Sequence, residues 1–484
     1  MVHFWYNYNN YVRRTLIHSN QFTLDQLAPI AVYSKLKEIF PDEITYLFES
    51  AGQSEGNYSF ICIGARERLQ YINDKTIYTN SNEEVTTLDQ NPFEFLKEYY
   101  AKIDTTLYKE ATKKLNVGYV DGFIGYIGYD MVKVFEPKLK SFMDNLKDEL
   151  HTPDLDLILP KLVLVYSHKN HQITLISTLK EFAEKFQTIE NELKGTYTYK
   201  HRVYNIGNDK GTFAHSKEKF FEMIDKSKEM IKSGDVFQIL MTNRFTRNIK
   251  VDPFSFYRIL RTKNPSPYMF LMEYENFSIV GSSPEVMVRL TEGEILLRPI
   301  AGTRKRGSTK QRDKELEIEL LNDPKELAEH LMLIDLGRND VGRVAKTGSV
   351  KVEDIMHIER FSHVMHIVSD VVAQINEDKD MFDLFMATFT AGTMTGAPKI
   401  RAMELIAEYE GIKRGFYSGS VGYFGFDGNM DSAITIRTAM VKEDKVVLQA
   451  GAGVVADSQN ELEYLEVNNK LGALIHSLED LDKK

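Results

Sequence analysis

Two pairs of glutamates have a spacing that suits metal binding. The four side chains are Glu326, Glu329, Glu463 and Glu466. The first pair falls in a predicted helix over Asp323–Leu336, and the second in a predicted helix over Glu461–Leu478. A separation of three residues places each pair on one helix face, and two facing helices could supply the oxygen ligands that Mg2+ prefers. Acidic helix faces are also common at solvated surfaces, so the spacing alone leaves both interpretations open.

Three glycine-rich turns in the second half lie beside hydroxyl side chains. They are Pro299–Thr303, Ala391–Lys399 and Gly451–Gly453. In the second turn, Pro398 suits the first position of a helix that carries Lys399. A helix N-terminus preceded by Gly and Thr offers N–H groups and hydroxyls to an anion. Each segment also fits an ordinary turn or cap. Taken together, the three favour a substrate with several carboxylates.

Two polar side chains occupy predicted strands. His366 lies on Val364–Ile375, on the same face as Asp370, and could donate or accept a proton there. Arg437 lies on Asp431–Val441 and could bind a carboxylate through two hydrogen bonds. A structural histidine and a buried ion pair are the alternatives. From the residues alone we predict a Mg2+-dependent enzyme that acts on a small anion.

The composition is that of a soluble globular protein. The chain has 484 residues, 43% of them hydrophobic and 27% charged, with a formal net charge of −10. These values argue against long disorder and make nucleic acid and anionic membranes poor partners. The single cysteine, Cys62, lies in an apolar run, which fits a reducing compartment. No signal peptide is recognised and no segment approaches the ~20 apolar residues that span a bilayer. We therefore expect a cytoplasmic protein.

The elements that must position these residues alternate helices with short strands. An amphipathic helix is expected over Ser216–Ser233, with Gly234 as its stop signal. The Asp427-Gly428 turn predicts a hairpin between Ser418–Phe426 and the strand Asp431–Val441. Hairpins beside helices indicate an α+β fold with mainly antiparallel sheets. We expect three regions: an N-terminal subdomain (1–195), a polar connector (196–215) and a catalytic region (216–484).

Six stretches, in order, resemble the chorismate-utilising enzymes, and the resemblance covers nearly the whole chain. They are Gly281–Glu285, Arg298–Gly307, Glu329–Arg343, His363–Asp370, Gly392–Met403 and Gly451–Lys470. The resemblance implies the fold of anthranilate synthase component I, with two antiparallel β-sheets packed together around the active-site cleft and helices outside.

Matching positions imply roles for individual residues. The four glutamates resemble the Mg2+ ligands, where the ion would hold the ring carboxylate of chorismate. The positions that match chorismate contacts are Gly302, Thr303, Tyr417, Arg437, Gly451, Ala452 and Gly453, with Lys470 nearby. Glu285 resembles the general acid that protonates the departing ring hydroxyl. His366 matches the histidine associated with pyruvate elimination, and Thr393 would help to orient the substrate.

Two positions favour one member of this family. Isochorismate and salicylate synthases carry a lysine base that activates water, where this chain has Gln238. Ammonia needs no such base. The 4-amino-4-deoxychorismate synthases typically carry a lysine where this chain has Ala301. The resemblance thus implies an anthranilate synthase, a lyase that forms anthranilate and pyruvate from chorismate and ammonia through aminodeoxyisochorismate. The alternatives are 4-amino-4-deoxychorismate synthase of the folate pathway and a non-catalytic tryptophan-sensing relative.

A second site is implied by Leu47–Ser50 and Asn264–Met269, which resemble the tryptophan-binding segments of feedback-inhibited subunits. The residues concerned are Glu49, Ser50, Asn264, Pro267, Tyr268 and Met269. Carboxylate, hydroxyl and carbonyl groups could bind the ammonium and indole N–H of L-tryptophan. A strand end and a proline-rich turn are the structural alternatives, and Asn57 stands where relatives often have arginine.

The ammonia source is expected outside this chain. A glutamine amidotransferase needs a nucleophilic cysteine on an exposed elbow, whereas Cys62 lies between two isoleucines. We therefore expect a separate glutamine amidotransferase subunit, with free ammonia as a substitute at alkaline pH.

Overall fold

The strands form one hydrogen-bonded network that divides into two sheets. The structure, a computed structural model, describes residues 16–50, 58–199, 207, 209–361 and 364–481. Two long strands, β3 (Tyr58–Ile72) and β7 (Leu155–Ser167), pair along their whole length and belong to both sheets. The other edge of β7 pairs with one strand near its start and with a different strand near its end. The network divides at this pair.

The first sheet is antiparallel and contains strands from both halves of the chain. In spatial order its strands are β1 (His18–Thr23), β8 (Gln172–Ser177), β7, β3, β2 (Thr45–Glu49), β11 (Tyr268–Glu273), β12 (Phe277–Ser283), β21 (Thr438–Lys442), β22 (Lys445–Val454) and β10 (Gln238–Arg247), with β9 (Thr212–Phe213) and β18 (Gly396–Ala397) on the outer edge of β10.

The second sheet is also antiparallel and shares β3 and β7 with the first. In spatial order its strands are β5 (Val85–Leu88), β4 (Lys75–Thr79), β3, β7, β6 (Gly122–Ile127), β19 (Ser420–Gly425), β20 (Met430–Ile434), β13 (Val286–Thr291), β14 (Glu294–Leu297), β17 (Val364–Gln374) and β16 (Lys351–Arg360), with β15 (Ile300–Lys305) on the edge of β17 that also pairs with β14.

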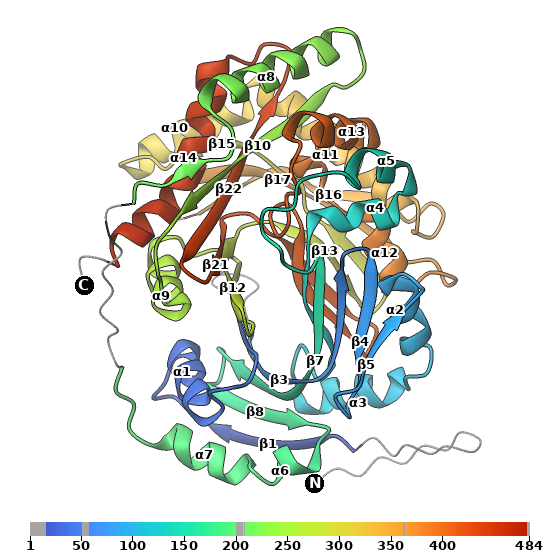
Figure 1. Cartoon of the computed structure of the whole chain (residues 1–484), viewed down its shortest axis with the longest axis vertical. Helices are drawn as coiled ribbons and strands as arrows, with labels where there is room; N and C mark the ends of the chain where they lie inside the picture. Colours follow the sequence, from blue (N-terminus) through green and yellow to red (C-terminus); the bar gives the residue numbers. More distant parts are fainter. Residues whose placement is uncertain (1–15, 51–57, 200–206, 208, 362–363, 482–484) are drawn as a thin grey trace.

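Helices cover the outside of these sheets. The α-helices are α1 (Pro29–Ile39), α2 (Pro92–Tyr100), α3 (Thr105–Leu115), α4 (Val132–Phe135), α5 (Lys140–Met143), α6 (Lys180–Ala183), α7 (Phe186–Lys194), α8 (Lys217–Lys232), α9 (Pro253–Lys263), α10 (Lys310–Leu321), α11 (Pro324–Gly342), α12 (Met381–Thr388), α13 (Lys399–Glu410) and α14 (Asn460–Glu479), and the 3-10 turns are η1 (Tyr129–Met131), η2 (Pro137–Leu139) and η3 (Gly392–Met394). Figure 1 shows α8, α13 and α14 at one end of the molecule and α1 with α7 at the other. Helix α14 packs on β22, and α11 packs on β15 and β17.

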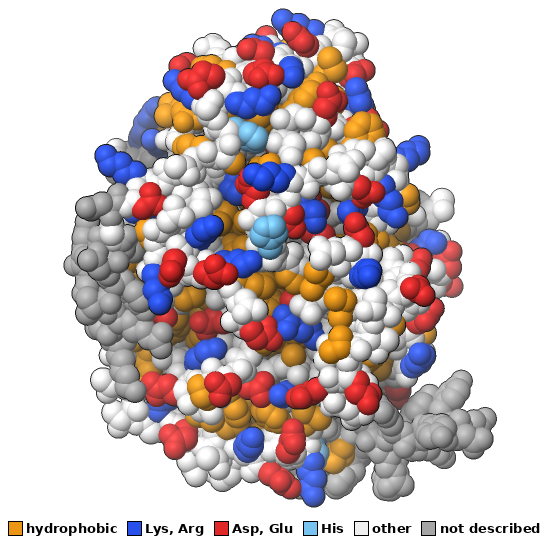
Figure 2. All heavy atoms as spheres, viewed as in Figure 1, with side chains coloured by type: hydrophobic (Ala, Val, Ile, Leu, Met, Phe, Trp, Pro, Cys, Tyr) orange, Lys and Arg blue, Asp and Glu red, His pale blue; other side chains and the backbone are white. Residues whose placement is uncertain are grey.

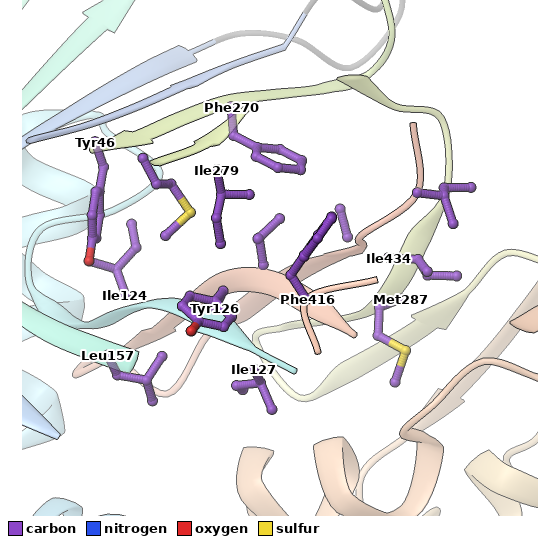
Figure 3. Packing of buried hydrophobic residues seen from close by; sticks show 14 of the residues in the cluster. Tyr46, Ile124, Tyr126, Ile127, Leu157, Phe270, Ile279, Met287, Phe416 and Ile434 are labelled. Atoms are coloured by element: carbon purple, nitrogen blue, oxygen red, sulfur yellow. The ribbon is translucent and has the colours of Figure 1, made fainter. Parts of the chain in front are cut away.

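The two halves of the chain share one hydrophobic core. Strand β2 pairs with β11, and β6 pairs with β19, so N-terminal strands lie directly beside C-terminal ones. Figure 3 shows the packing where they meet, with Tyr126 near Ile279 and Phe416. The expected boundary at 196–215 divides the sequence into two parts, but the strands of these parts alternate within the same sheets. Part of that connector, residues 200–206 and 208, lies outside the described residues.

Most predicted elements are confirmed, with three differences. The predicted helix over Ser216–Ser233 is confirmed as α8, which begins after Ser216, whose hydroxyl accepts a hydrogen bond from the Lys219 N–H. The charged stretch at 179–193 predicts a single helix but forms the two helices α6 and α7. The residue Pro398 precedes α13 as its N-cap and is not its first helical residue. The predicted strand Asp431–Val441 is wrong as one strand, because it consists of β20 and β21.

The break between β20 and β21 is where the chain crosses from the second sheet to the first. Its backbone turns at Arg437, which has a φ of 51°. The left-handed region is uncommon for a residue with a Cβ, so the pairing of the flanking strands with different sheets must hold it there. The prediction that Arg437 lies on a strand face is therefore wrong.

Surface features agree with a helix-covered globular protein. Acidic and basic side chains are interspersed on the face in Figure 2, with apolar side chains between them. In the part of the chain that the structure describes, no helix is both long and apolar enough to cross a membrane.

Candidate active site

Two sheet-to-sheet crossovers lie side by side at the centre of the candidate site. Glu285 lies between β12 of the first sheet and β13 of the second, and Arg437 lies between β20 and β21. Backbone hydrogen bonds join the crossovers: the Ile434 N–H donates to the Glu285 carbonyl (3.0 Å), and the Ser282 N–H donates to the Arg437 carbonyl (3.2 Å). The topology thus places an acidic and a positively charged residue together, although they are 152 positions apart in the sequence.

The Glu285 carboxyl is buried, with 8% of the residue exposed. Burial raises its pKa to about 7, and the Thr393 hydroxyl, which donates to Oε1 at 2.8 Å, opposes that rise. Arg437 and Lys470 also oppose it. A pocket between β13 and α11 opens against Glu285 and Thr393 and is otherwise mainly apolar. Carboxyls whose pKa is moved toward neutrality in a pocket are suited to general acid chemistry.

The guanidinium of Arg437 makes no ion pair within the described part of the chain. Glu285 and Glu466 are near enough to affect its pKa, which burial lowers. The Tyr417 hydroxyl is buried beside it, and burial raises its pKa to about 12, so the phenol is neutral. A half-buried guanidinium with no ion pair among the described residues, beside a phenol, is a ready partner for an anionic carboxylate.

The glycine-rich segment Gly451–Gly453 lies on β22, paired with β10. A Cβ at Gly453 would lie 2.7 Å from the Gln238 amide nitrogen, and a Cβ at Gly451 would lie 2.9 Å from the Met241 carbonyl. Gly451 therefore needs to be glycine because a Cβ would meet the backbone of β10, whereas at Gly453 the close atom is the end of a flexible side chain. Ala452 between them is fully buried. The Lys470 ammonium, from α14, donates to the Gly451 carbonyl at 2.8 Å.

His366, on β17, faces Gly302 and Thr303 on the neighbouring strand β15, so the prediction of a turn at Pro299–Thr303 is wrong. Its Nδ1 lies 2.9 Å from the Gly302 carbonyl and 3.1 Å from the Thr303 hydroxyl. A carbonyl can only accept, so Nδ1 carries the proton and Nε2 is left as a basic nitrogen. Burial lowers the pKa of the ring, which keeps it neutral near pH 7. The predicted role in proton transfer fits this tautomer.

The glutamate pairs lie at the starts of two helices. Asp323 caps α11 by accepting hydrogen bonds from the Lys325 and Glu326 N–H groups, and Pro324 takes the first position. Glu326 is therefore in the first turn of α11, and Glu463 is in the first turn of α14. Acidic side chains are stabilised at helix N-termini by the helix dipole.

The electrostatics of these glutamates fit a divalent cation. Burial raises the pKa of Glu329, and the nearby carboxylates of Glu326 and Glu466 raise it further. Burial and Glu466 likewise raise the pKa of Glu463. Carboxylates that repel one another in a partly buried place form a donor set that a hard cation would neutralise.

The side chains themselves are not arranged as a cage. Across the described stretches, no group of three or more Asp, Glu, His or Cys side chains is placed to hold a metal ion. Glu326 instead pairs with Arg304 (3.2 Å), and Glu466 pairs with Lys470 (2.6 Å). To bind a metal ion, the Glu326 and Glu466 side chains would have to rotate away from Arg304 and Lys470. Arg304 was not singled out from the sequence, although it lies in the matched motif.

Gln238 occupies the place where a lysine base would stand in related enzymes. Its amide nitrogen lies 3.2 Å from Oε1 of Glu329, and its amide oxygen is buried without a hydrogen-bond partner in the structure. The side chain thus links β10 to the glutamates of α11. Ala301, on β15, pairs with Ile367. Lys399, which follows the predicted glycine-rich turn Ala391–Lys399, pairs with Asp340.

The two predicted regulatory segments are neighbours on the first sheet. Met269 pairs with Glu49 in the ladder between β11 and β2. The Glu49 carboxylate is buried and already accepts hydrogen bonds from Tyr257 (2.7 Å) and Arg261 (2.9 and 3.0 Å). An incoming ammonium would have to share it with these partners. The Ser50 side chain and Pro267 are partly exposed beside this ladder.

The remaining two residues of this region face the crossovers. The Asn264 carbonyl accepts a hydrogen bond from the Ser282 hydroxyl. Tyr268 donates to Asp431 (2.9 Å) and accepts from Arg289. The region therefore contacts β12 and β20, the strands that lead to Glu285 and Arg437.

The two sheets, their crossovers and this set of side chains define a class of α+β enzyme whose site is suited to a small substrate with more than one carboxylate. The chain belongs to the chorismate binding enzyme family, whose model matches residues 42–476. It is 43% identical to anthranilate synthase component 1 of Aquifex aeolicus over 482 residues, covering 95% of this chain and 94% of the relative. It is 40% identical to that of Acetivibrio thermocellus, covering 94% of each.

Solved structures agree with this assignment of fold. Anthranilate synthase component I of Streptococcus pneumoniae superposes with a TM-score of 0.75 at 31% identity, covering 96% of this chain and 100% of that one. The menaquinone-specific isochorismate synthase of Escherichia coli superposes with a TM-score of 0.70 at 18% identity, which shows a shared fold. The predicted family and the predicted two-sheet α+β fold are confirmed.

Proposed function

We propose that the protein is the synthase subunit of a cytoplasmic anthranilate synthase in tryptophan biosynthesis. It would convert chorismate and ammonia into anthranilate, pyruvate and water. The observation that carries the proposal is a buried acid, Glu285, in a site where position 238 offers an amide and no base. The names of relatives at about 40% identity over most of both chains support it.

Substrate binding would use negatively charged residues, through a metal ion, and positively charged residues directly. Glu326, Glu329, Glu463 and Glu466 would hold Mg2+, which when bound supplies positive charge for the ring carboxylate. Arg437 and Tyr417 would bind the second carboxylate, and the glycines of β22 would let the substrate approach the backbone. Lys470 keeps the Gly451 carbonyl fixed by its 2.8 Å hydrogen bond.

Amination requires that the ring hydroxyl leave as water. Glu285 would donate the proton, since its raised pKa keeps a useful fraction protonated near pH 7. Ammonia would attack the carbon beside the carboxylate-bearing one, and its lone pair needs no base. The Gln238 amide cannot deprotonate water, which disfavours the isochorismate product.

The resulting aminodeoxyisochorismate would lose pyruvate. This elimination removes the enolpyruvyl group with transfer of a proton, and aromatises the ring to anthranilate. His366 offers a neutral base for this step, with Nε2 unprotonated as argued from its contact with Gly302. Thr393 would hold the Glu285 carboxyl in position through both steps.

Ammonia would come from a separate glutamine amidotransferase subunit. Burial raises the pKa of the Cys62 thiol, which keeps this only cysteine protonated and unreactive. L-Tryptophan would inhibit the enzyme by binding near Glu49 and Met269.

The decisive experiment is to incubate the purified protein with chorismate, Mg2+ and ammonium at alkaline pH and to identify the products. Anthranilate and pyruvate in equal amounts support the proposal. Accumulation of 4-amino-4-deoxychorismate without pyruvate would assign the folate-pathway reaction instead, and no turnover would favour a non-catalytic relative.

A further inference from the structure

A buried ion pair lies behind the candidate site and takes no part in the chemistry above. Glu410 ends α13, and Arg414 follows four residues later; each side chain is 1% exposed. The guanidinium donates from Nε to Oε2 at 2.9 Å and from Nη2 to Oε1 at 2.7 Å. Desolvation of two charges is costly, and an apolar pair of similar size is often as stable. The pair's own stability therefore does not explain why two charges are buried here.

The remaining N–H groups of Arg414 reach three separate segments. They donate to the Met394 carbonyl (2.8 Å), the Leu240 carbonyl (2.9 Å) and the Ser418 hydroxyl (3.4 Å). With the two bonds to Glu410, all five donors of the guanidinium are used. The guanidinium also packs on the ring of Tyr129, with Cζ 4.7 Å from the centroid. Its orientation is thus fixed from every side.

Each of these acceptors is next to a residue of the candidate site. Met394 follows Thr393, and Ser418 follows Tyr417. Leu240 is the register partner of Gly453 in the ladder between β10 and β22. A single guanidinium therefore connects three segments: the one with Thr393, which holds the acid Glu285, the one with Tyr417, and the glycine-rich segment of β22.

Glu410 extends the same connection along β10. Its Oε1 accepts hydrogen bonds from the Thr242 N–H and the Thr242 hydroxyl, both at 2.9 Å. Thr242 is the register partner of Gly451. The Thr242 N–H lies on the outer edge of β10, between the positions that pair with β18 and β9, and donates to this carboxylate. Strand β10 is therefore bonded to the ion pair at two positions, Leu240 and Thr242.

We propose that Arg414, held by Glu410, is a positioning residue that sets the spacing of the Thr393, Tyr417 and Gly451–Gly453 segments around the substrate. It contacts backbone groups behind the site and acts through the residues that they carry. The identity of the substrate rests on the proposed function, whereas the positioning role concerns the chain alone. A lysine at 414 would keep the charge but supplies three donors from one point and no planar fork.

The test compares Arg414→Lys with Arg68→Lys, a matched change in a second bidentate pair. Arg68 binds the fully buried Asp156 through two bonds of 2.7 Å between β3 and β7, strands that carry no residue of the candidate active site. We expect Arg414→Lys to lower kcat for anthranilate formation at least tenfold and to raise KM for chorismate, both expressed per folded protein. Arg68→Lys should lower Tm while kcat and KM stay within about twofold of wild type.

Amide hydrogen exchange on the same proteins reports positioning without any substrate. In Arg414→Lys, exchange should accelerate in 391–398 and 415–420 while β3 and β7 stay protected; in Arg68→Lys the pattern should reverse. If Arg414→Lys does not fold, Glu410→Gln, which keeps the size and one acceptor oxygen, takes its place with the same expectations. Unchanged kinetic constants, or exchange that accelerates uniformly over the chain, would overturn the proposal. Inactive wild-type protein with the expected exchange pattern would refute the proposed function alone.

Discussion

The Thr393 hydroxyl donates a 2.8 Å hydrogen bond to Oε1 of Glu285, across 108 positions of sequence. Thr393 comes from the 3-10 turn η3 and Glu285 from the first sheet-to-sheet crossover. The bond favours the charged carboxylate, whereas burial favours the neutral acid and dominates, so that the pKa lies near 7. Thr393 thus tunes the proposed acid as well as orienting it.

Removing the hydroxyl should move the pH dependence of the enzyme upward. A general acid works when protonated, so kcat/KM for chorismate at constant free ammonia should fall as the pH rises through the pKa of Glu285. In Thr393→Val the carboxylate loses its donor, the pKa rises, and this falling limb should move to higher pH. Measurement of kcat/KM between about pH 5 and pH 9, roughly two units on either side of the pKa, tests this. A limb at the wild-type position would show that another group titrates.

Glu329 should bind metal and at the same time destabilise the metal-free protein. Its folded-state pKa is raised by burial and by neighbouring carboxylates, so its charged form costs stability as the pH rises from the unfolded-state pKa through the folded-state one. We expect metal-free Glu329→Gln at pH 8 to melt at or above the wild-type temperature. We also expect it to lose most of the Tm increase and activity that Mg2+ gives the wild type.

The exposed Glu461 provides the control for this change. It is on α14, close to Glu463 in sequence, and pairs with Lys217 at the surface. Glu461→Gln should keep the wild-type response to Mg2+ in both melting and activity. Equal responses of Glu329→Gln and wild type to added Mg2+ would contradict the assignment of Glu329 as a ligand.

Local patterns in the sequence predicted the elements well but not the places where the chain changes sheet. The cap at Ser216, the hairpin turn at Asp427-Gly428 and the alternation over β17 are all signalled within a few residues. The crossover at Arg437 has no such signal, because polar and apolar residues continue to alternate through it. Its left-handed backbone is set by β12 and β22, which pair with β21 in the first sheet.

Charged residues of the interior were the least predictable part of the site. Arg414 and Glu410 are four positions apart, a spacing that is usual for a solvated helical ion pair. Only the packing of η3, β10 and the Tyr417 segment around them makes them buried. The matched motifs named the residues that would touch substrate, since each carries its own chemistry, but gave no reason to notice the groups that hold those residues.

Replacing Gln238 by lysine should allow water, in place of ammonia, to attack the ring of chorismate. The new ammonium would lie beside Glu329, which the amide contacts at 3.2 Å, and in its neutral form it could take a proton from water attacking the ring. With chorismate and Mg2+ but no ammonia, Gln238→Lys should form a detectable amount of isochorismate, which wild type should not. Product analysis by chromatography tests this. Gln238→Met, similar in length and without a base, is the control and should form none.

Glu49 should be needed for inhibition by L-tryptophan but not for catalysis. Its carboxylate is the only acidic group among the predicted tryptophan contacts, and neutralising it in Glu49→Gln removes the partner of the ligand's ammonium. We expect tryptophan neither to slow turnover nor to raise the Tm of this variant, while its kcat without tryptophan stays within about twofold of wild type. Loss of the pair with Arg261 should also cost about 1–3 kcal/mol of stability.

Glu273→Gln separates this effect from general weakening of the sheet. Glu273 is at the opposite end of the same ladder, paired with Thr45, and also accepts a hydrogen bond from a buried tyrosine, Tyr33. Its replacement disturbs β2 and β11 to a similar extent but lies at the far end of the ladder from Met269. Because only Glu49 is at the predicted ligand, Glu273→Gln should keep full sensitivity to tryptophan. Full sensitivity to tryptophan in both variants would place the inhibitor site away from β2.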